Sequence, residues 1–258
     1  MAYQSFDLSG KTALITGGNG GIGLGMADAM AQSGANVCIW GRNAEKNLAA
    51  LDQLTKHGTE VAAMTCDVSV ETQVEARFAE TTERFGNLHG VFANAGVSGG
   101  RDQVPFVEMT TERWRQIVGV NLDGAFFTFR AAAQHMIKHG EGGRIVGTAS
   151  LAAISGAARN EHYAATKGGM ISMIYAMSVE LARYGITVNA ILPGWIATAM
   201  TETAFNWKKF SNNVMQRIPY RRWGQPSDFG GIAVYIMSSA SAYHTGDSFL
   251  IDGGYNKF

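Results

Sequence analysis

The chain has 258 residues, of which 46% are hydrophobic and 16% charged, a composition typical of a globular protein with a large core. Lysine plus arginine equals aspartate plus glutamate at 21 each, so charge gives no reason to expect nucleic acid or an anionic membrane as a partner. No stretch reaches the roughly 18 apolar residues of a membrane span, and the N-terminus shows no apolar signal core. Cys38 and Cys66 lie in apolar runs, which favours reduced, buried thiols. We therefore expect a soluble cytoplasmic protein.

Short apolar runs alternate with longer helical patterns along the chain. This alternation is typical of a doubly wound parallel sheet with helices on both faces, and strands buried on both faces are near-continuous apolar runs. We find no linker, so residues 1–258 are expected to form one domain. The expected strands are Thr12–Thr16, Ala35–Trp40, Glu60–Thr65, Leu88–Ala93, Gly143–Ala149, Ile186–Ile191 and Asp247–Ile251.

A glycine-rich turn, TGGNGGIG, follows the first expected strand and precedes a helical run. In this context glycines let the backbone approach a pyrophosphate, and the helix N-terminus supplies unpaired N–H groups and a partial positive charge. The sequence therefore predicts a dinucleotide site. Its spacing is carried by Gly17, Gly21 and Gly23, and the turn is lined by Asn19, Gly20 and Ile22.

A second stretch, from Ser150 to Lys167, combines groups suited to proton transfer. On a helix, the four-residue spacing of Tyr163 and Lys167 places the phenol and the ammonium on one face. A cation beside a phenol favours the phenolate and lowers the pKa from about 10, so that the tyrosine can exchange a proton with an alcohol or carbonyl oxygen. The Ser150 hydroxyl is placed to hold that oxygen.

These motifs together resemble the short-chain dehydrogenase/reductase family, in its order and over nearly the whole chain. The residues that carry the resemblance are TGGNGGIG, the ANAG of Ala93–Gly96, Asn121, Ser150, Tyr163-x-x-x-Lys167 and the PGWIAT of Pro193–Thr198. The resemblance implies a Rossmann fold with seven parallel strands in the order 3-2-1-4-5-6-7. It also implies a soluble NAD(P)-dependent alcohol dehydrogenase or ketone reductase, and a homotetramer.

The choice of nicotinamide cofactor depends on the end of the second expected strand. The acidic residue that usually holds the adenosine 2′-hydroxyl is absent there, and Arg42 offers a guanidinium suited to a 2′-phosphate, with Asn43 beside it. We therefore favour NADP(H). A solvated surface arginine is the alternative, and the glycine turn has no basic residue, which leaves NAD(H) open.

The resemblance implies further cofactor contacts. Asp67 and Val68 meet the adenine, although Asp67 also fits a helix N-cap. Asn94, Ala95 and Gly96 pass close to the ribose. Pro193 and Gly194 form the floor under the nicotinamide, while the Ile196 backbone and Thr198 meet its carboxamide or the phosphate.

For catalysis, the resemblance implies that Ser150 and Tyr163 bind the substrate oxygen and that Tyr163 is the general acid/base. Lys167 bonds the nicotinamide ribose and tunes the phenol. Asn121 lies in a helix kink whose bound water links Lys167 to solvent; a satisfied core amide is the alternative for Asn121. No metal is expected, because the histidines show no ligand spacing.

The substrate is the least determined feature. The segment 195–223 is expected to form a lid. Apolar neighbours suggest a ketone or secondary alcohol with hydrophobic flanks, and they include Val97, Leu151, Ala153, Trp195, Phe205, Trp207 and Phe210. An NAD-dependent dehydrogenase of a polyol, sugar acid or hydroxysteroid is the alternative enzyme, and a catalytically silent nucleotide-binding protein is the alternative from another class. His162 is expected to be structural or to border the substrate pocket, and Met170, Met173 and Met177 are expected in a core or subunit interface.

Overall fold

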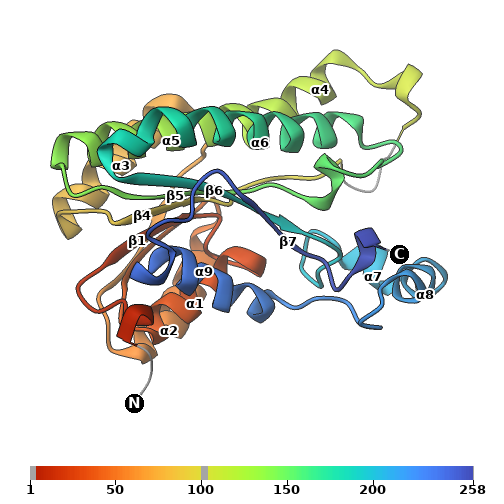
Figure 1. Ribbon diagram of the computed structural model, residues 1–258. Coiled ribbons are helices and arrows are strands. Elements are labelled where there is room, and N and C mark those ends of the chain that lie inside the picture. Colours follow the sequence, from red (N-terminus) through yellow and green to blue (C-terminus); the bar gives the residue numbers. More distant parts are fainter. Residues whose placement is uncertain (1–3, 100–103, 258) are drawn as a thin grey trace.

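The computed structural model describes residues 4–99 and 104–257 (Figure 1). Within these residues, seven parallel strands form one sheet in the order β3-β2-β1-β4-β5-β6-β7, as the resemblance implied. This order places the first βα turn beside the loop after β4, at the point where the direction of winding reverses. The strands are β1 (Thr12–Thr16), β2 (Asn36–Gly41), β3 (Val61–Thr65), β4 (Gly90–Ala93), β5 (Gly143–Thr148), β6 (Ile186–Pro193) and β7 (Ser248–Ile251).

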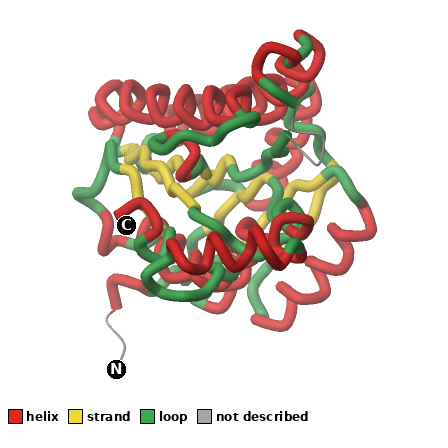
Figure 2. Tube along the Cα trace, turned by 90° about the vertical axis from the view of Figure 1, so that its right-hand side faces the viewer, coloured by secondary structure: helices red, strands yellow, loops and turns green. Residues whose placement is uncertain are grey.

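Helices cover both faces of the sheet, which Figure 2 shows as a yellow layer between red ones. One face carries α3 (Glu71–Phe85), α5 (Gly124–His139) and α6 (Glu161–Leu181), and the other carries α1 (Gly21–Gln32), α2 (Ala44–Leu54) and α9 (Gly230–Met237). Three further helices lie beyond the carboxyl edge of the sheet: α4 (Thr111–Val118), α7 (Glu202–Asn206) and α8 (Lys208–Arg217). No helix among residues 4–99 and 104–257 is long and apolar enough to cross a membrane.

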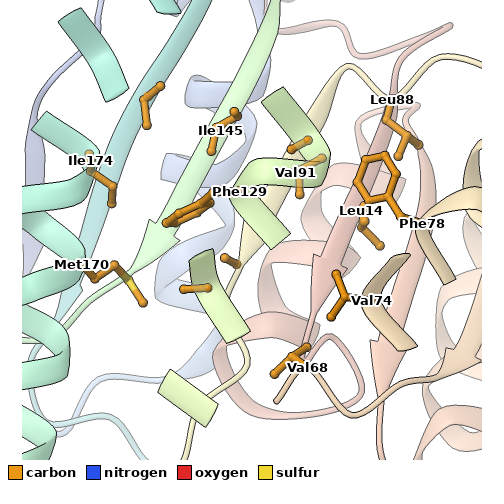
Figure 3. Close-up of a cluster of buried hydrophobic side chains, with 14 of the residues drawn as sticks. Leu14, Val68, Val74, Phe78, Leu88, Val91, Phe129, Ile145, Met170 and Ile174 are labelled. Atoms are coloured by element: carbon orange, nitrogen blue, oxygen red, sulfur yellow. The ribbon is translucent and has the colours of Figure 1, made fainter. Parts of the chain in front are cut away.

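Two hydrophobic cores result from the alternation of side chains along each strand. Leu14 points into the core under α3, α5 and α6, whereas its neighbours Ala13 and Ile15 point into the core under α1 and α9. Figure 3 shows the first core, in which Phe129 of α5 and Met170 of α6 pack onto the strands. Both faces of every central strand are therefore buried, which is why these strands have near-continuous apolar sequences.

The element boundaries agree with the sequence to within two residues in most strands. Strand β4 begins at Gly90, two residues later than expected, and β6 continues to Pro193. The helix kink expected at Asn121 takes the form of a π-helical segment, Gly119–Asp123, between α4 and α5. Such a segment adds one residue to a turn and shifts the side chains that follow.

The buried residues outside the motifs behave as their sequence context predicted. Cys38 and Cys66 are both buried free thiols, and burial raises the pKa of each to about 11. They are therefore poor nucleophiles. Met170 is fully buried in the core, and Met173 and Met177 are partly buried against it, which agrees with the expected place of these methionines in a core or subunit interface.

Candidate active site

The four residues expected to be catalytic converge at the carboxyl edge of the sheet. Ser150 follows β5, Asn121 lies in the π-helical segment, and Tyr163 and Lys167 lie on one face of α6, whose helix begins at Glu161. The Lys167 Nζ is 5.6 Å from the centroid of the Tyr163 ring. The four-residue spacing thus brings the phenol and the amine together, as predicted.

The electrostatics of this pair differ from the sequence-based prediction. Burial raises the pKa of Tyr163, and a hydrogen bond with Ser150 opposes this increase. Lys167 is only 3% exposed, and burial lowers its pKa to about 8. Its amine donates a hydrogen bond of 2.7 Å to the carbonyl oxygen of Thr148. Burial therefore sets the net direction of the Tyr163 pKa shift in this structure, and the lowering by the Lys167 charge remains a prediction.

Asn121 links the π-helical segment to the loop after β4. Its Oδ1 accepts a hydrogen bond from the Val97 N–H and its Nδ2 donates one to the Val97 carbonyl, each 2.8 Å long. A third contact, 3.3 Å long, runs from Nδ2 to Thr166 Oγ1 on α6. A side chain placed on Gly96 would lie 3.3 Å from Asn121 Oδ1 and 3.5 Å from Lys167 Nζ. Asn121 is thus a satisfied amide that also joins α6 to the loop after β4.

The glycine turn has the shape that a pyrophosphate site requires. Gly17 and Gly21 have φ values of 63° and 52°, a region that L-residues rarely adopt. A Cβ on Gly23 would lie 2.3 Å from the Gly17 carbonyl oxygen, so this position excludes any side chain. The N-cap residue of α1 is Gly20, which has no side chain to cap the helix. Backbone N–H groups of the first turn are therefore left for an anion. These features fit a dinucleotide.

Two residues that the sequence analysis did not single out, Thr16 and Asn47, hold the glycine turn (the glycine cradle) in place by hydrogen bonds. Thr16 Oγ1 accepts hydrogen bonds of 3.0 Å from the N–H groups of Asn94 and Ala95. The Asn94 side chain donates in return to the carbonyls of Thr16 and Gly17. On the other side, Asn19 Nδ2 donates to Asn47 Oδ1 at 2.7 Å. Thr16 and Asn47 are unremarkable in sequence, and their partners are known only once the strands pair.

The region expected to hold the adenosine lies at the ends of β2 and β3. Arg42 is 60% exposed, and its Nη1 lies 3.7 Å from Asp67 Oδ2. The N-cap alternative for Asp67 is wrong, because the N-cap of α3 is Val70 and Asp67 instead accepts hydrogen bonds from Ser69. The amide of Asn43 caps α2, where its Oδ1 accepts from the Lys46 N–H.

Two more of the predicted cofactor residues, Ile22 and Val68, supply apolar surface. Val68 is buried and belongs to the core under α3 and α5, and it packs so closely on Gly124 that a side chain there would lie 2.8 Å from the valine methyl. Ile22 in the first turn of α1 is partly buried against the other core.

The PGWIAT stretch returns the chain from β6 to the glycine turn. Pro193 ends β6, and the N–H of Gly194 donates to the Ile251 carbonyl on β7 at 2.9 Å. Ile196 is 4% exposed. Thr198 reaches the phosphate cradle, since a Cβ on Gly21 would lie 3.3 Å from its methyl group. This stretch therefore connects the end of β6 with the glycine turn.

The segment 195–223 contains α7 and α8 and an aromatic cluster. Trp195 lies 5.2 Å from Phe210 and 5.5 Å from Trp223 between ring centroids, and Phe205 lies 5.3 Å from Trp223. Its two ends meet where the Gly224 N–H donates to the Trp195 carbonyl. A cavity of about 350 Å³ is lined by Ala197, Thr198, Ala199, Glu202 and Phe205.

Comparison with known proteins places this geometry in a family. A family model described as enoyl-(acyl carrier protein) reductase matches residues 17–256. The L-rhamnose-1-dehydrogenase of Scheffersomyces stipitis is 38% identical over 251 residues, or 96% of each chain. The 2-dehydro-3-deoxy-D-gluconate 5-dehydrogenase of Escherichia coli is 34% identical over 99% of each chain. The chain belongs to the short-chain dehydrogenase/reductase family.

Solved structures agree with this assignment. A gluconate 5-dehydrogenase from Burkholderia cenocepacia, in complex with NADP and tartrate, is similar over the whole of both chains, with a TM-score of 0.93 and 32% identity. This short-chain dehydrogenase/reductase is therefore an NAD(P)-dependent oxidoreductase that transfers a hydride between the dinucleotide and a carbonyl or alcohol carbon. No group of histidine, cysteine or acidic side chains suited to a metal occurs within the described ranges.

Proposed function

We propose that this enzyme interconverts a secondary alcohol and a ketone on a polyhydroxylated substrate, with NADP(H) as the preferred cofactor and Tyr163 as the general acid/base. The observation that carries the proposal is the convergence of Ser150, Tyr163 and Lys167 on the edge of the sheet that also holds the glycine cradle. The bound dinucleotide supplies or accepts the hydride.

In the reducing direction, Ser150 and Tyr163 hold the carbonyl oxygen by hydrogen bonds, and Tyr163 Oη gives it a proton as the hydride arrives. The phenol is protonated at neutral pH and can donate this proton, although burial raises its pKa and makes it a weaker acid than a free tyrosine. Lys167 holds the nicotinamide ribose and remains close to Tyr163. In alcohol oxidation the path runs backwards: Tyr163 first loses its proton to solvent, and its phenolate oxygen then accepts the proton of the alcohol. Asn121 keeps the loop beside Lys167 in place, and a water chain there returns the proton to solvent.

The substrate class rests on the relatives. The curated relatives similar over almost the whole chain include dehydrogenases of L-rhamnose and of 2-dehydro-3-deoxy-D-gluconate. A solved relative carries tartrate, a hydroxylated dicarboxylate. These names favour the sugar and sugar-acid branch over an apolar ketone, and they describe oxidation of an alcohol rather than reduction of an enoyl group.

The preference for NADP(H) rests on Arg42. Its guanidinium is exposed at the end of β2 and leaves room for a phosphate to replace its long contact with Asp67. The alternative is an NAD-dependent enzyme, in which Arg42 keeps its contact with Asp67 when the cofactor is bound.

The deciding experiment follows nicotinamide absorbance with each cofactor across a panel of L-rhamnose, D-gluconate, 2-dehydro-3-deoxy-D-gluconate and cyclohexanol. We expect turnover of a polyhydroxylated compound, with a higher kcat/KM for NADP⁺ than for NAD⁺. Arg42→Ala is expected to lower kcat/KM for NADP⁺ by about tenfold, the value of roughly one charge-assisted hydrogen bond, and to leave that for NAD⁺ unchanged. Equal losses with both cofactors would assign Arg42 a structural role.

The assembly is part of the same proposal. Phe126 on α5 and Tyr175 and Val179 on α6 are exposed on the outer helical layer, where they offer an apolar surface for a second copy. We infer a homotetramer, which light scattering on the purified protein tests directly. Its buried, reduced cysteines suit the cytoplasm.

A further inference from the structure

Two asparagine amides meet at the end of β2, one from the glycine turn and one from α2. Asn47 on α2 is 4% exposed, and its Oδ1 accepts a hydrogen bond of 2.7 Å from Asn19 Nδ2 in the turn. Both amides lie against Gly41, where a Cβ would lie 2.1 Å from Asn19 Nδ2 and 2.6 Å from Asn47 Oδ1. The contact therefore requires a residue without a side chain at the last position of β2.

The orientation of the Asn47 amide is fixed by two carbonyl groups. Its Nδ2 donates hydrogen bonds of 3.0 Å to the Gly41 oxygen and 3.2 Å to the Met64 oxygen on β3. Because a backbone carbonyl can only accept, the donor nitrogen must face these two strands and Oδ1 must face the glycine turn. Turning the buried amide over would place its oxygen against two further acceptors, at the cost of both hydrogen bonds.

The orientation of Asn47 in turn fixes that of Asn19. Since Asn47 presents an acceptor, Asn19 must present its donor nitrogen, and its own Oδ1 is directed away from Asn47. Among residues 4–99 and 104–257, this oxygen has no hydrogen-bond partner. The glycine turn thus holds an acceptor oxygen in a set orientation beside the end of β2.

The position of this oxygen indicates which part of a dinucleotide it meets. The end of the second strand is where a Rossmann fold holds the adenosine ribose, and the distance from Asn19 to Gly41 places the amide there. An amide oxygen needs a donor as partner, which a ribose hydroxyl supplies and a phosphate dianion does not. The pyrophosphate is served by the N–H groups of the same turn.

We propose that Asn47 is a positioning residue for the dinucleotide: it orients the Asn19 amide so that Asn19 Oδ1 accepts a hydrogen bond from a hydroxyl of the adenosine ribose. Asn47 is buried behind Asn19 and acts only through it. The inference depends on the dinucleotide site and not on the identity of the substrate or on the role of Arg42, because NADH and NADPH both carry a free hydroxyl on this ribose.

The test measures the dissociation constants of NADH and NADPH, by their fluorescence, for Asn19→Ala, Asn47→Ala and the double variant. Asn19→Ala removes the acceptor and should raise both constants about tenfold, the value of one hydrogen bond. Asn47→Ala leaves the Asn19 amide free to turn and should raise both constants about fivefold. The double variant should match Asn19→Ala, because a residue that acts through another adds nothing once the other is removed.

Reduced nicotinamide mononucleotide, which lacks the adenosine, shows whether the effect is confined to the ribose. Its dissociation constant should stay within about twofold in all three variants, whereas an opened turn would weaken its phosphate contact as well. Gln53→Ala is the matched control. Its amide also joins α2 to another helix, through Asp28 on α1, but it lies at the far end of α2, and it should change none of the constants.

Gly41→Ala provides a second variant if Asn47→Ala does not fold. Its methyl group would displace the Asn19 amide from Asn47 and should raise the constants for NADH and NADPH as Asn47→Ala does. The role of Asn47 is overturned if its variant binds both dinucleotides normally, if the two single losses multiply to about fiftyfold in the double variant, or if the mononucleotide is weakened equally. A loss confined to NADPH would assign the pair to the 2′-phosphate and overturn the hydroxyl contact.

Discussion

The two edges of the central sheet use buried polar groups in opposite ways. At the carboxyl edge, Lys167 is buried with its pKa lowered to about 8, and Tyr163 is held where burial raises its pKa. At the amino edge, ring nitrogens complete the backbone hydrogen bonding. His89 Nδ1 accepts from the Thr12 N–H at 3.0 Å and His135 Nε2 from the Leu88 N–H at 3.1 Å. At the carboxyl edge, burial of Lys167 costs stability and places a reactive group. At the amino edge, the hydrogen bonds of His89 and His135 add stability.

The direction of the strands explains why the reactive groups lie at the carboxyl edge of the sheet and not at the amino edge. Parallel strands direct their carboxyl ends, with the loops that follow them, towards one side, where a helix N-terminus and a glycine turn are available for an anion. The buried amine of Lys167 is tolerated because the Thr148 carbonyl accepts its hydrogen bond. The following predictions alter one edge at a time.

The largest effect is expected from Tyr163→Phe. Removing the phenol oxygen removes the proton donor while keeping the ring, so kcat should fall by at least about 100-fold. Tyr175→Phe on the same helix is the control, because its hydroxyl contacts Ser248 on the outer surface and not the site. Steady-state assays in both directions check the prediction, and near-normal turnover of Tyr163→Phe would refute the assignment of the acid.

A smaller effect is expected from the glycine turn. Gly23→Ala places a methyl group 2.3 Å from the Gly17 carbonyl oxygen, so the turn must open and the affinity for NADPH should fall by roughly tenfold or more. Gly231→Ala on α9, outside the turn, meets nothing within 4 Å and is the matched control. Fluorescence titration of both variants measures the difference; equal affinities would show that the turn does not form the cofactor site.

The smallest expected effect is on the unfolding free energy, through the pH dependence of the histidines at the amino edge. Burial lowers the pKa of both His89 and His135, so the folded state prefers neutral rings. Their contribution to stability is complete above the unfolded pKa of about 6.5 and is lost as pH falls through the lower folded values. Urea unfolding at neutral pH and at about pH 5 should show this loss.

His135→Gln sharpens this prediction, because glutamine keeps an acceptor for the Leu88 N–H but does not titrate. We expect the acid-dependent loss of unfolding free energy to shrink by about 1 kcal/mol, one hydrogen bond. An unchanged pH dependence in the variant would mean that His135 does not contribute to acid sensitivity.

Much of the cofactor half could be predicted from the sequence, because its determinants are local. Gly17, Gly21 and Gly23 are required by backbone conformation, and strand, turn and helix follow each other directly. The family resemblance implied a helix kink at Asn121, but neither its π-helical form nor the two hydrogen bonds of the Asn121 amide to Val97, which is distant in sequence, could be predicted. Helical spacing predicts that a charge lies near Tyr163, but it does not show that both groups are buried, and burial raises the pKa of Tyr163 and lowers that of Lys167.

The part of the site expected to hold the substrate could not be predicted, because its side chains come into contact only after folding. Trp195, Phe210 and Trp223 form one cluster, although Trp195 and Trp223 lie at opposite ends of the lid segment. His162 was expected to be structural or to border the pocket, and its burial beside Gly99 follows only from the packing of α6 on the loop after β4.

The contrast between the edges is tested most directly by the unfolding free energy of Lys167→Met as a function of pH. The substitution fills the site and removes a buried charge whose pKa is displaced from 10.5 to about 8. At neutral pH we expect it to abolish turnover and to stabilise the protein by about 2 kcal/mol, after the loss of the hydrogen bond to Thr148. A lysine with a lowered pKa costs stability below its folded value, so the advantage of methionine should vanish as pH rises from about 8 towards 10.5. A variant that is less stable than the wild type at neutral pH, or whose advantage does not change with pH, would contradict the account.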